Sequence, residues 1–291
     1  MNHPLPQRFI AALHVSGSAL LFAAMGACVK LVSAELALAV LVFFRSLFGL
    51  LALLPLLPTL ARQSLATSQP AMHLARALFG LSAMACYFLA ISQLRLAEAV
   101  LLSFSAPLFI PWFAFVGLRE PLARGSGVSA LVGFIGIALI LKPDGGLFQW
   151  GALAGLGAGI FAAMAMVCVR RLARTEPATR VVFYYSVACT LLSAVPPIGF
   201  WETPGPDTWL PLLGMGLFAT TGQLLLTRGY ALAPAAQVGP FSYLAVVFAA
   251  LFGWLLWHEV PDSTSLLGAA LVSAAGILAL RRESAVVDKP A

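Results

Sequence analysis

The chain has 291 residues, of which 61% are hydrophobic and 10% are charged, with a formal net charge of +6. Its mean hydropathy is +0.96. A soluble domain of this length could not cover so many apolar side chains, so the composition excludes a water-soluble globular protein and predicts one that lies in a lipid bilayer.

Apolar runs of about 18 to 25 residues follow one another along the chain, and each is long enough to cross about 30 Å of hydrocarbon as a helix. They lack the strict alternation of barrel strands. The pattern predicts an all-α polytopic membrane protein with ten transmembrane helices, the first of them retained rather than cleaved as a signal peptide. The expected spans are 10–32, 36–58, 73–92, 97–118, 125–141, 150–168, 180–200, 209–229, 235–257 and 265–280.

Basic residues fall mainly on one side of this arrangement. Thirteen of the 17 Lys and Arg residues lie on the side of the N-terminus, Lys30, Arg95 and Lys142 lie on the other, and Arg45 lies within a span. Because cytoplasmic loops accumulate basic residues, both termini are expected in the cytoplasm, with the protein in a bacterial-type plasma (inner) membrane. This placement explains the positive charge without nucleic acid as a partner. The short loops leave no room for an ATPase domain.

The second half of the chain repeats the first at an offset of about 139 residues. Residues 22–25, Phe-Ala-Ala-Met, recur at 161–164, and residues 97–120 align with 236–259 without a gap. A repeat of five spans, an odd number, inserts with inverted orientation, and inverted repeats are typical of secondary transporters with a substrate site near the midplane. The chain is therefore interpreted as two inverted five-helix repeats, 1–145 and 146–291, that form one transport unit.

Prolines are expected to break two of the spans. Pro107 and Pro111 lie in the fourth span and Pro240 lies in the ninth. A proline within a span frees a carbonyl that needs another partner, often substrate, water or a moving neighbour. Glu98 and its counterpart Gln237 lie at the outer ends of the same spans. We predict hinge or gating roles for these five residues, with plain packing and a solvated helix-start carboxylate as the alternatives.

Polar side chains inside hydrocarbon are costly, so each one is a candidate for substrate contact. The eighth span is the most polar, and Gln223 in it presents both a donor and an acceptor to an amino acid. His14 and Ser18 share one face of the first span, with Met25 about two turns further on. Solvation of His14 near the cytoplasmic interface is the alternative.

Two repeat-related pairs place a hydroxyl and an aromatic ring at equivalent points of the fourth and ninth spans. These are Ser103 with Ser242 and Phe104 with Tyr243. Aromatics on other spans would complete an apolar substrate cavity with few polar anchors, although an aromatic in a span more often packs or anchors at an interface. The further aromatic candidates are Tyr87, Phe22 and Phe161.

The five-plus-five layout, the short charged turns after the fourth and ninth spans, and the segment FLAISQLRLAEAV at 88–100 resemble the drug/metabolite transporter superfamily, specifically its EamA-type carriers. The resemblance covers essentially the whole chain, and within it the likeness is to YddG-type exporters of aromatic and other amino acids. It implies that the first, third, fourth, sixth, eighth and ninth spans surround the central cavity. The other four spans would form the periphery.

These observations predict an exporter of small amphipathic metabolites, foremost amino acids with aromatic or other bulky apolar side chains, working by alternating access. Drugs, purines or other metabolites are the alternative substrates. A non-transporting sensor is a more distant alternative, as is an intramembrane enzyme, whose His-Glu-x-x-His and Gly-x-Ser-x-Gly motifs are absent. No cofactor or metal site is expected, because no clustered Cys/His spacing occurs. One protomer suffices for a site, and an oligomer remains open.

The charges within the spans bear on energy coupling. No Asp or Glu lies at the middle of any expected span. A carboxylate relay is the usual device of a proton-coupled pump. The sequence therefore favours a facilitator, an exchanger or a weakly coupled exporter, and His14 leaves proton coupling open.

Overall fold

The computed structural model describes residues 7–56, 66–119, 126–141, 150–195, 201–232 and 239–287. All regular structure in these ranges is helical, and no strand occurs in them. The elements of the first half are α1 (Gln7–Val32), α2 (Leu38–Leu51), η1 (Leu54–Leu56), α4 (Pro70–Gln93), α5 (Leu96–Ser103), α6 (Ala106–Leu118) and α7 (Ser126–Leu141). Those of the second half are α8 (Trp150–Leu172), α9 (Ala178–Ala194), η3 (Pro206–Thr208), α10 (Trp209–Leu232), η4 (Gly239–Tyr243), α12 (Leu244–Trp257) and α13 (Ser263–Val287).

Within the described residues, five helical stretches are long and apolar enough to cross a membrane: Phe9–Val32, Pro70–Gln93, Leu96–Leu118, Trp150–Leu172 and Pro206–Gly229. Shorter apolar helices cover parts of four other expected spans. The described α-helices leave part of three of these spans uncovered: α2 ends at Leu51 and is followed by η1, α9 ends at Ala194, and α12 begins at Leu244 after η4. The expected span ends at 57–58, 196–200 and 235–238 lie outside the described residues. Hydropathy alone marks an apolar run, whereas prolines and terminal turns decide how much of it is α-helical.

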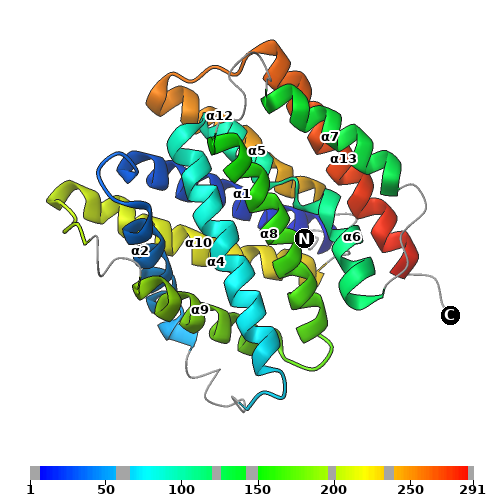
Figure 1. Ribbon diagram of the computed structural model, residues 1–291, viewed down its shortest axis with the longest axis horizontal. Coiled ribbons are helices and arrows are strands. Elements are labelled where there is room, and N and C mark those ends of the chain that lie inside the picture. Colours follow the sequence, from blue (N-terminus) through cyan, green and yellow to red (C-terminus); the bar gives the residue numbers. More distant parts are fainter. Residues whose placement is uncertain are drawn as a thin grey trace, which may run out of the picture.

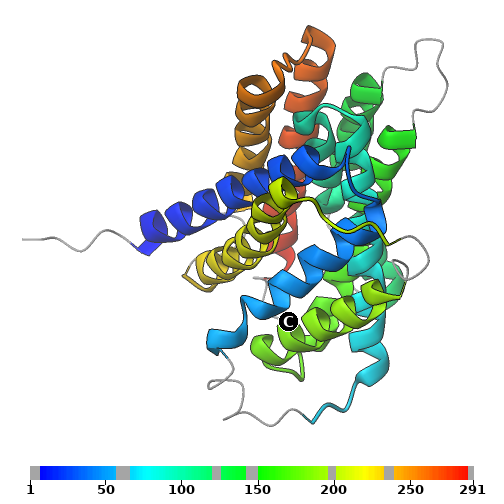
Figure 2. The same cartoon turned by 90° about the vertical axis from the view of Figure 1, so that its left-hand side faces the viewer.

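Helix pairs that are distant in sequence lie side by side. The most extensive contacts join α1 to α10, α4 to α8 and α7 to α13. Figure 1 shows α7 and α13 as neighbours at one edge of the bundle. In Figure 2, turned by 90°, α1 and α10 run together and project from one side of the molecule. Each of these pairs therefore joins one helix from the first half of the chain to one helix from the second half.

The main apolar core lies where α1, α2, α4, α5, α10 and α12 meet. Its largest fully enclosed side chains include Phe88, Leu41, Ile91, Leu96 and Met215. A smaller cluster joins α5, α6, α7, α8 and α13. The start of α5 is thus enclosed on several sides, which fixes the segment from which the candidate site is built.

Small residues set the closest helix approaches. A Cβ added at Gly216 of α10 would lie 2.7 Å from the carbonyl carbon of Phe48 and 2.9 Å from the amide nitrogen of Gly49, both backbone atoms of α2. Backbone cannot rotate away as a flexible side chain can. Glycine at this position is therefore a requirement of the α2–α10 contact.

The Gly216→Ala variant is expected to lower stability by about 1–3 kcal/mol, because the new methyl group forces α2 and α10 apart. Gly127→Ala in α7 is the matched control, since a Cβ there meets no atom within 4 Å. Alanine is the better helix former, so the control should be neutral or slightly stabilising. Thermal unfolding in detergent measures both, and equal midpoints for the two variants would contradict this account of the contact.

Candidate functional site

The fourth expected span is broken in the middle. α5 ends at Ser103, Phe104 and Ser105 form a turn, and α6 begins at Ala106. Pro107 explains the break, because it has no N–H to donate to the carbonyl of Ser103 and its ring would strike that carbonyl. The break predicted from Pro107 is therefore confirmed, and Pro107 itself lies in the first turn of α6, where a missing N–H costs nothing.

The other two prolines behave differently. The prediction that Pro111 interrupts the span is wrong, because α6 continues through it. Pro240 lies in the 3-10 turn η4 that precedes α12, so the ninth span also changes helix type near its proline. Gln237, the remaining predicted gating residue of this span, lies outside the described residues.

The break in the fourth span meets the start of α12. The rings of Phe104 and Tyr243 lie 5.8 Å apart at an angle of 56°, and the Tyr243 hydroxyl donates to the carbonyl oxygen of Phe104 at 3.4 Å. That carbonyl has no helical N–H to accept from, because the helix ends at this point. The Ser103 hydroxyl donates instead to the carbonyl oxygen of Val100, in its own helix, at 2.8 Å. The pair predicted from the repeat thus forms a direct contact, which we call the aromatic crossing.

A cavity of about 330 Å³ lies beside the aromatic crossing, between α5, α12 and α13. Its polar lining comes from Glu98, Tyr243, Ser265 and Ser273, and the rest is apolar. α13 was expected at the periphery, yet it supplies much of this wall. An apolar space with a few convergent polar groups is the usual form of a small-molecule site.

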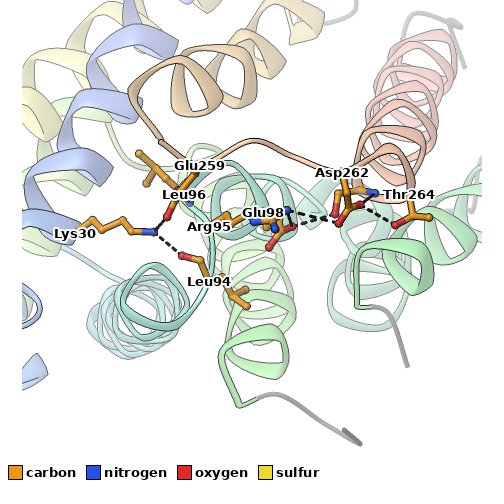
Figure 3. Close-up of polar contacts among 9 residues, drawn as sticks. Lys30, Leu94, Arg95, Leu96, Glu98, Glu259, Asp262 and Thr264 are labelled. Atoms are coloured by element: carbon orange, nitrogen blue, oxygen red, sulfur yellow. Dashed lines mark hydrogen bonds and ion pairs between the residues drawn. The ribbon is translucent and has the colours of Figure 1, made fainter. Parts of the chain in front are cut away.

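An ion pair joins the end of α1 to the segment after α12 (Figure 3). The Lys30 ammonium at the end of α1 donates to the Glu259 carboxylate and, at 2.8 Å, to the carbonyl oxygen of Leu94. Glu259 also accepts from the Leu96 amide at 2.9 Å. Both charged side chains are largely enclosed, with 14% and 17% of their surface exposed. Three distant segments are thereby tied together by one carboxylate.

The position of Glu259 follows from the end of α12. His258 adopts φ 54°, a left-handed conformation, and the Glu259 amide donates back to the carbonyl oxygen of Gly253 at 3.0 Å. The His258 amide donates to the carbonyl oxygen of Trp254 at 3.1 Å, and this bond from a left-handed residue is the αL type of helix ending, which reverses the chain. A Cβ at Gly253 would come within 2.9 Å of the Glu259 carboxylate, so the side chain lies back over the last turn.

A second set of charged side chains lies beside the ion pair of Lys30 and Glu259. Arg95 is 3.7 Å from the Glu98 carboxylate and 3.6 Å from that of Asp262, and Glu98 accepts from the Ser265 hydroxyl at 3.0 Å. Asp262 also accepts from the Ser265 amide at 2.8 Å and caps α13. We call Lys30, Arg95, Glu98, Glu259 and Asp262 the outer network, because the charge pattern of the sequence predicts the non-cytoplasmic side here.

The remaining predicted residues are dispersed. Gln223 has an exposed side chain and does not line the cavity. His14 donates from Nδ1 to the carbonyl oxygen of Ile10 at 2.7 Å. Ser18 is 1% exposed, and its hydroxyl has no hydrogen-bond partner within the described ranges. Met25 is buried, while Phe22, Tyr87, Phe161 and Ser242 are half-buried.

Two of these residues face small groups of a neighbouring helix. Phe22 lies beside Gly222 of α10, where an added Cβ would come within 3.4 Å of the Phe22 ring. Tyr87 lies beside Gly26 of α1, where an added Cβ would come within 3.0 Å of the Tyr87 hydroxyl. Packing accounts for both contacts. The structure thus places Glu98 and Tyr243 in the cavity wall, with Phe104 in contact with Tyr243, and leaves the other candidates apart.

Sequence reasoning missed Lys30, Glu259, Arg95 and Asp262 as members of one site. The signal was present, because the expected topology places all four at the same membrane boundary, where opposite charges can pair. Which span ends are adjacent depends on helix packing, and that was not available from the pattern. In the described part of the chain, no group of three His, Cys, Asp or Glu residues is placed to hold a metal ion.

Comparison with known proteins adds independent information. A model of the EamA-like transporter family matches residues 9–142 and, a second time, residues 149–281. The pseudopaline exporter of Pseudomonas aeruginosa is 35% identical over 88% of this chain and 90% of its own length. The riboflavin transporter of Vibrio cholerae is 30% identical over 77% of this chain and 76% of its own.

Two further comparisons extend this picture. The S-adenosylmethionine uptake transporter of Rickettsia bellii is 27% identical over 85% of each chain. A crystal structure of a protein with 23% identity superposes with a TM-score of 0.60 over 97% of this chain and 98% of its own, which shows the fold alone. These names support the EamA-type resemblance and not the narrower YddG-type one.

Glu259→Ala is expected to cost about 1–3 kcal/mol of stability, because it leaves the Lys30 ammonium and the Leu96 amide enclosed without their acceptor. Lys30→Met should cost less, since Glu259 keeps the Leu96 amide. In a double-mutant cycle of thermal unfolding, the combined variant should be more stable than the sum of the two losses predicts. Strict additivity would mean that the ion pair does not couple these segments.

Proposed function

Because this chain belongs to the EamA-like transporter family of integral membrane proteins, we propose that it exports small amphipathic metabolites by alternating access. Its two family matches, at 9–142 and 149–281, carry the proposal, since they divide the chain into two similar units. Two units of one family in a single chain provide the halves that must exchange conformations. The proposed boundaries of the two units are 1–145 and 146–291.

Local geometry supports the inverted repeat. Among the described residues other than glycine, positive φ occurs at Arg119 and His258, which are 139 positions apart, with values of 56° and 54°. Each ends the helix that follows a break, α6 in one half and α12 in the other. The packing of α1 on α10 and of α4 on α8 is the relation expected between spans one and eight and spans three and six of inverted repeats.

The aromatic crossing is the proposed centre of the substrate site. Phe104 and Tyr243 come from equivalent positions of the two halves, and they meet where both helices are broken. Helix breaks at membrane depth expose backbone carbonyls that can bind polar groups of a substrate, while the rings and the adjoining cavity of about 330 Å³ accept its apolar part. This chemistry suits molecules that combine a polar head with an apolar body.

Amino acids with aromatic or other bulky apolar side chains are the proposed first substrate class, exported across a bacterial-type plasma membrane with both termini in the cytoplasm. The second candidate class comprises larger metabolites, and the relatives named for pseudopaline, riboflavin and S-adenosylmethionine favour it. Flux of labelled amino acids and of these three compounds in the same proteoliposomes separates the two classes.

Tyr243→Ala is expected to reduce substrate flux in proteoliposomes about tenfold, because it removes the ring contact and the hydroxyl at the crossing. Phe241→Ala is the matched control in the same 3-10 turn, since Phe241 is 39% exposed and Tyr243 is 6% exposed. The control should retain flux. Equal flux in empty and protein-containing vesicles for every compound would refute the carrier proposal.

The outer network is the proposed outer gate, which must open to release substrate. Cys28 reports on it, since it lies two residues before Lys30 and is half-buried. In a background with Cys86, Cys168 and Cys189 replaced by alanine, Glu259→Ala should raise labelling of Cys28 by an externally added, membrane-impermeant maleimide several-fold.

The matched control for this experiment is Glu202→Ala. Glu202 accepts from the Ala37 amide at 3.2 Å and lies on the same predicted side, but it is exposed and outside the network. Its loss should leave labelling unchanged. Unchanged labelling in Glu259→Ala, or an equal rise in both variants, would show that the ion pair does not control access from this side.

A further inference from the structure

Two arginines lie inside helices at the junction of α2, α4 and α9, away from the aromatic crossing. Arg45 belongs to α2 and Arg76 to α4, and both are partly exposed. Each of these three helices contacts the other two. The Arg76 guanidinium lies over Tyr185 of α9, and both arginines are close enough to Tyr185 and Cys189 to act on them electrostatically. We call Arg45, His73, Arg76 and Tyr185 the arginine junction.

The Arg76 guanidinium stacks on an aromatic ring. Its carbon lies 4.0 Å from the centre of the Tyr185 ring, and Gly80 leaves the space for this arrangement, because a Cβ there would come within 2.6 Å of the ring. Stacking contributes a favourable cation–π contact but satisfies no N–H donor. The stacking thus holds the guanidinium in place without using its N–H donors.

Hydrogen-bond donors are left over at this junction. Nε and Nη1 of Arg76 and Nε of Arg45 are enclosed and have no acceptor anywhere in the described ranges. His73, one turn before Arg76, is 4% exposed, and neither of its ring nitrogens has a partner among the described residues. Enclosed donors without acceptors cost free energy, most of all when charged. These donors would therefore gain from an acceptor outside these ranges.

The carboxylate of Glu176, near the arginine junction, already accepts hydrogen bonds from other residues. Glu176 accepts from the Thr67 hydroxyl at 2.7 Å and from Arg180 at 2.6 Å. The Thr67 hydrogen bond, together with Arg180, lowers the pKa of the Glu176 carboxyl although burial opposes it. Neither Arg45 nor Arg76 forms an ion pair with a carboxylate in the described part of the chain. The segment 57–65, which joins η1 to the residues before α4, contains no Asp or Glu.

The depth of the junction fits a lipid headgroup. Arg76 follows Pro70, the first residue of α4, by six positions, which corresponds to about 9 Å along the helix. The charge pattern places this end of α4 at the cytoplasmic boundary, where a headgroup layer about 5–8 Å thick covers the hydrocarbon. Long Arg side chains reach from this depth to the interface. Lipid phosphates lie within that layer.

We propose that the arginine junction binds the headgroup of an anionic phospholipid, with Arg45 and Arg76 donating to its phosphate oxygens. Guanidinium groups pair with phosphate through two parallel N–H donors, so one phosphate satisfies groups that water reaches poorly. Basic pockets between helices near the cytoplasmic boundary are suited to anionic headgroups. The single negative charge of the bound phosphodiester offsets the repulsion between the two arginines and thereby stabilises the contact of α2 with α4 and α9.

The test uses the full-length protein in nanodiscs of phosphatidylcholine, with or without phosphatidylglycerol. Phosphatidylglycerol should raise the thermal midpoint of the wild type by several degrees and remain bound in native mass spectrometry. The Arg45→Gln/Arg76→Gln variant should lose most of that rise and most of the bound lipid. Arg171→Gln is the matched control, because Arg171 is an exposed arginine near the end of α8. It should behave as the wild type.

Three outcomes would overturn the proposal. One is an equal midpoint for the wild type in both nanodiscs, a result that does not depend on whether the variant folds. Another is a full response to phosphatidylglycerol in the double glutamine variant, once its size-exclusion profile shows that it is folded. The third is an equal rise when inorganic phosphate is added to phosphatidylcholine nanodiscs, because the site would then take a free solute anion.

Discussion

The Glu259 carboxylate holds together the end of the molecule where α1, α5 and α12 meet. It accepts from the Lys30 ammonium at the end of α1 and from the Leu96 amide at the start of α5, while the left-handed turn at His258 fixes its place after α12. A charge among apolar helices is tolerated only while it is paired and hydrogen-bonded. A movement of α1 or of α5 away from α12 therefore leaves Glu259 with one partner fewer, which penalises separation of these helices.

The short helix α5 connects the outer network to the aromatic crossing. α5 begins at the Leu96 amide that Glu259 binds and ends one residue before Phe104, which contacts Tyr243. A movement of this eight-residue helix must change both contacts, because its ends are the two contact points. The cavity beside it would change shape in the same movement, since Ala97, Glu98 and Leu101 line it. The arginine junction lies on other helices and bears on the stability of their packing.

Part of the site was predictable, because it depends on residues within one helical turn or on the alignment of the two halves. The break in the fourth span follows from Pro107, whose missing N–H acts within one turn, and the partnership of Phe104 with Tyr243 follows from a repeat that aligns equivalent positions. Pro111 shows the limit of the same rule, because α6 accommodates it without a break. The stacking of Arg76 on Tyr185 left no pattern in the sequence, since α4 and α9 are not equivalent spans of the two halves.

The sequence by itself determined the apolar helical character of the chain, the order of its apolar runs and the repetition of its two halves, because composition and periodicity are properties of single segments. Only the tertiary structure decided that Lys30 meets Glu259, that Glu98 lines a cavity, and that Gln223 remains exposed. Residues 229 positions apart become neighbours through helix packing. That packing depends on the summed fit of many small contacts, which no single segment encodes.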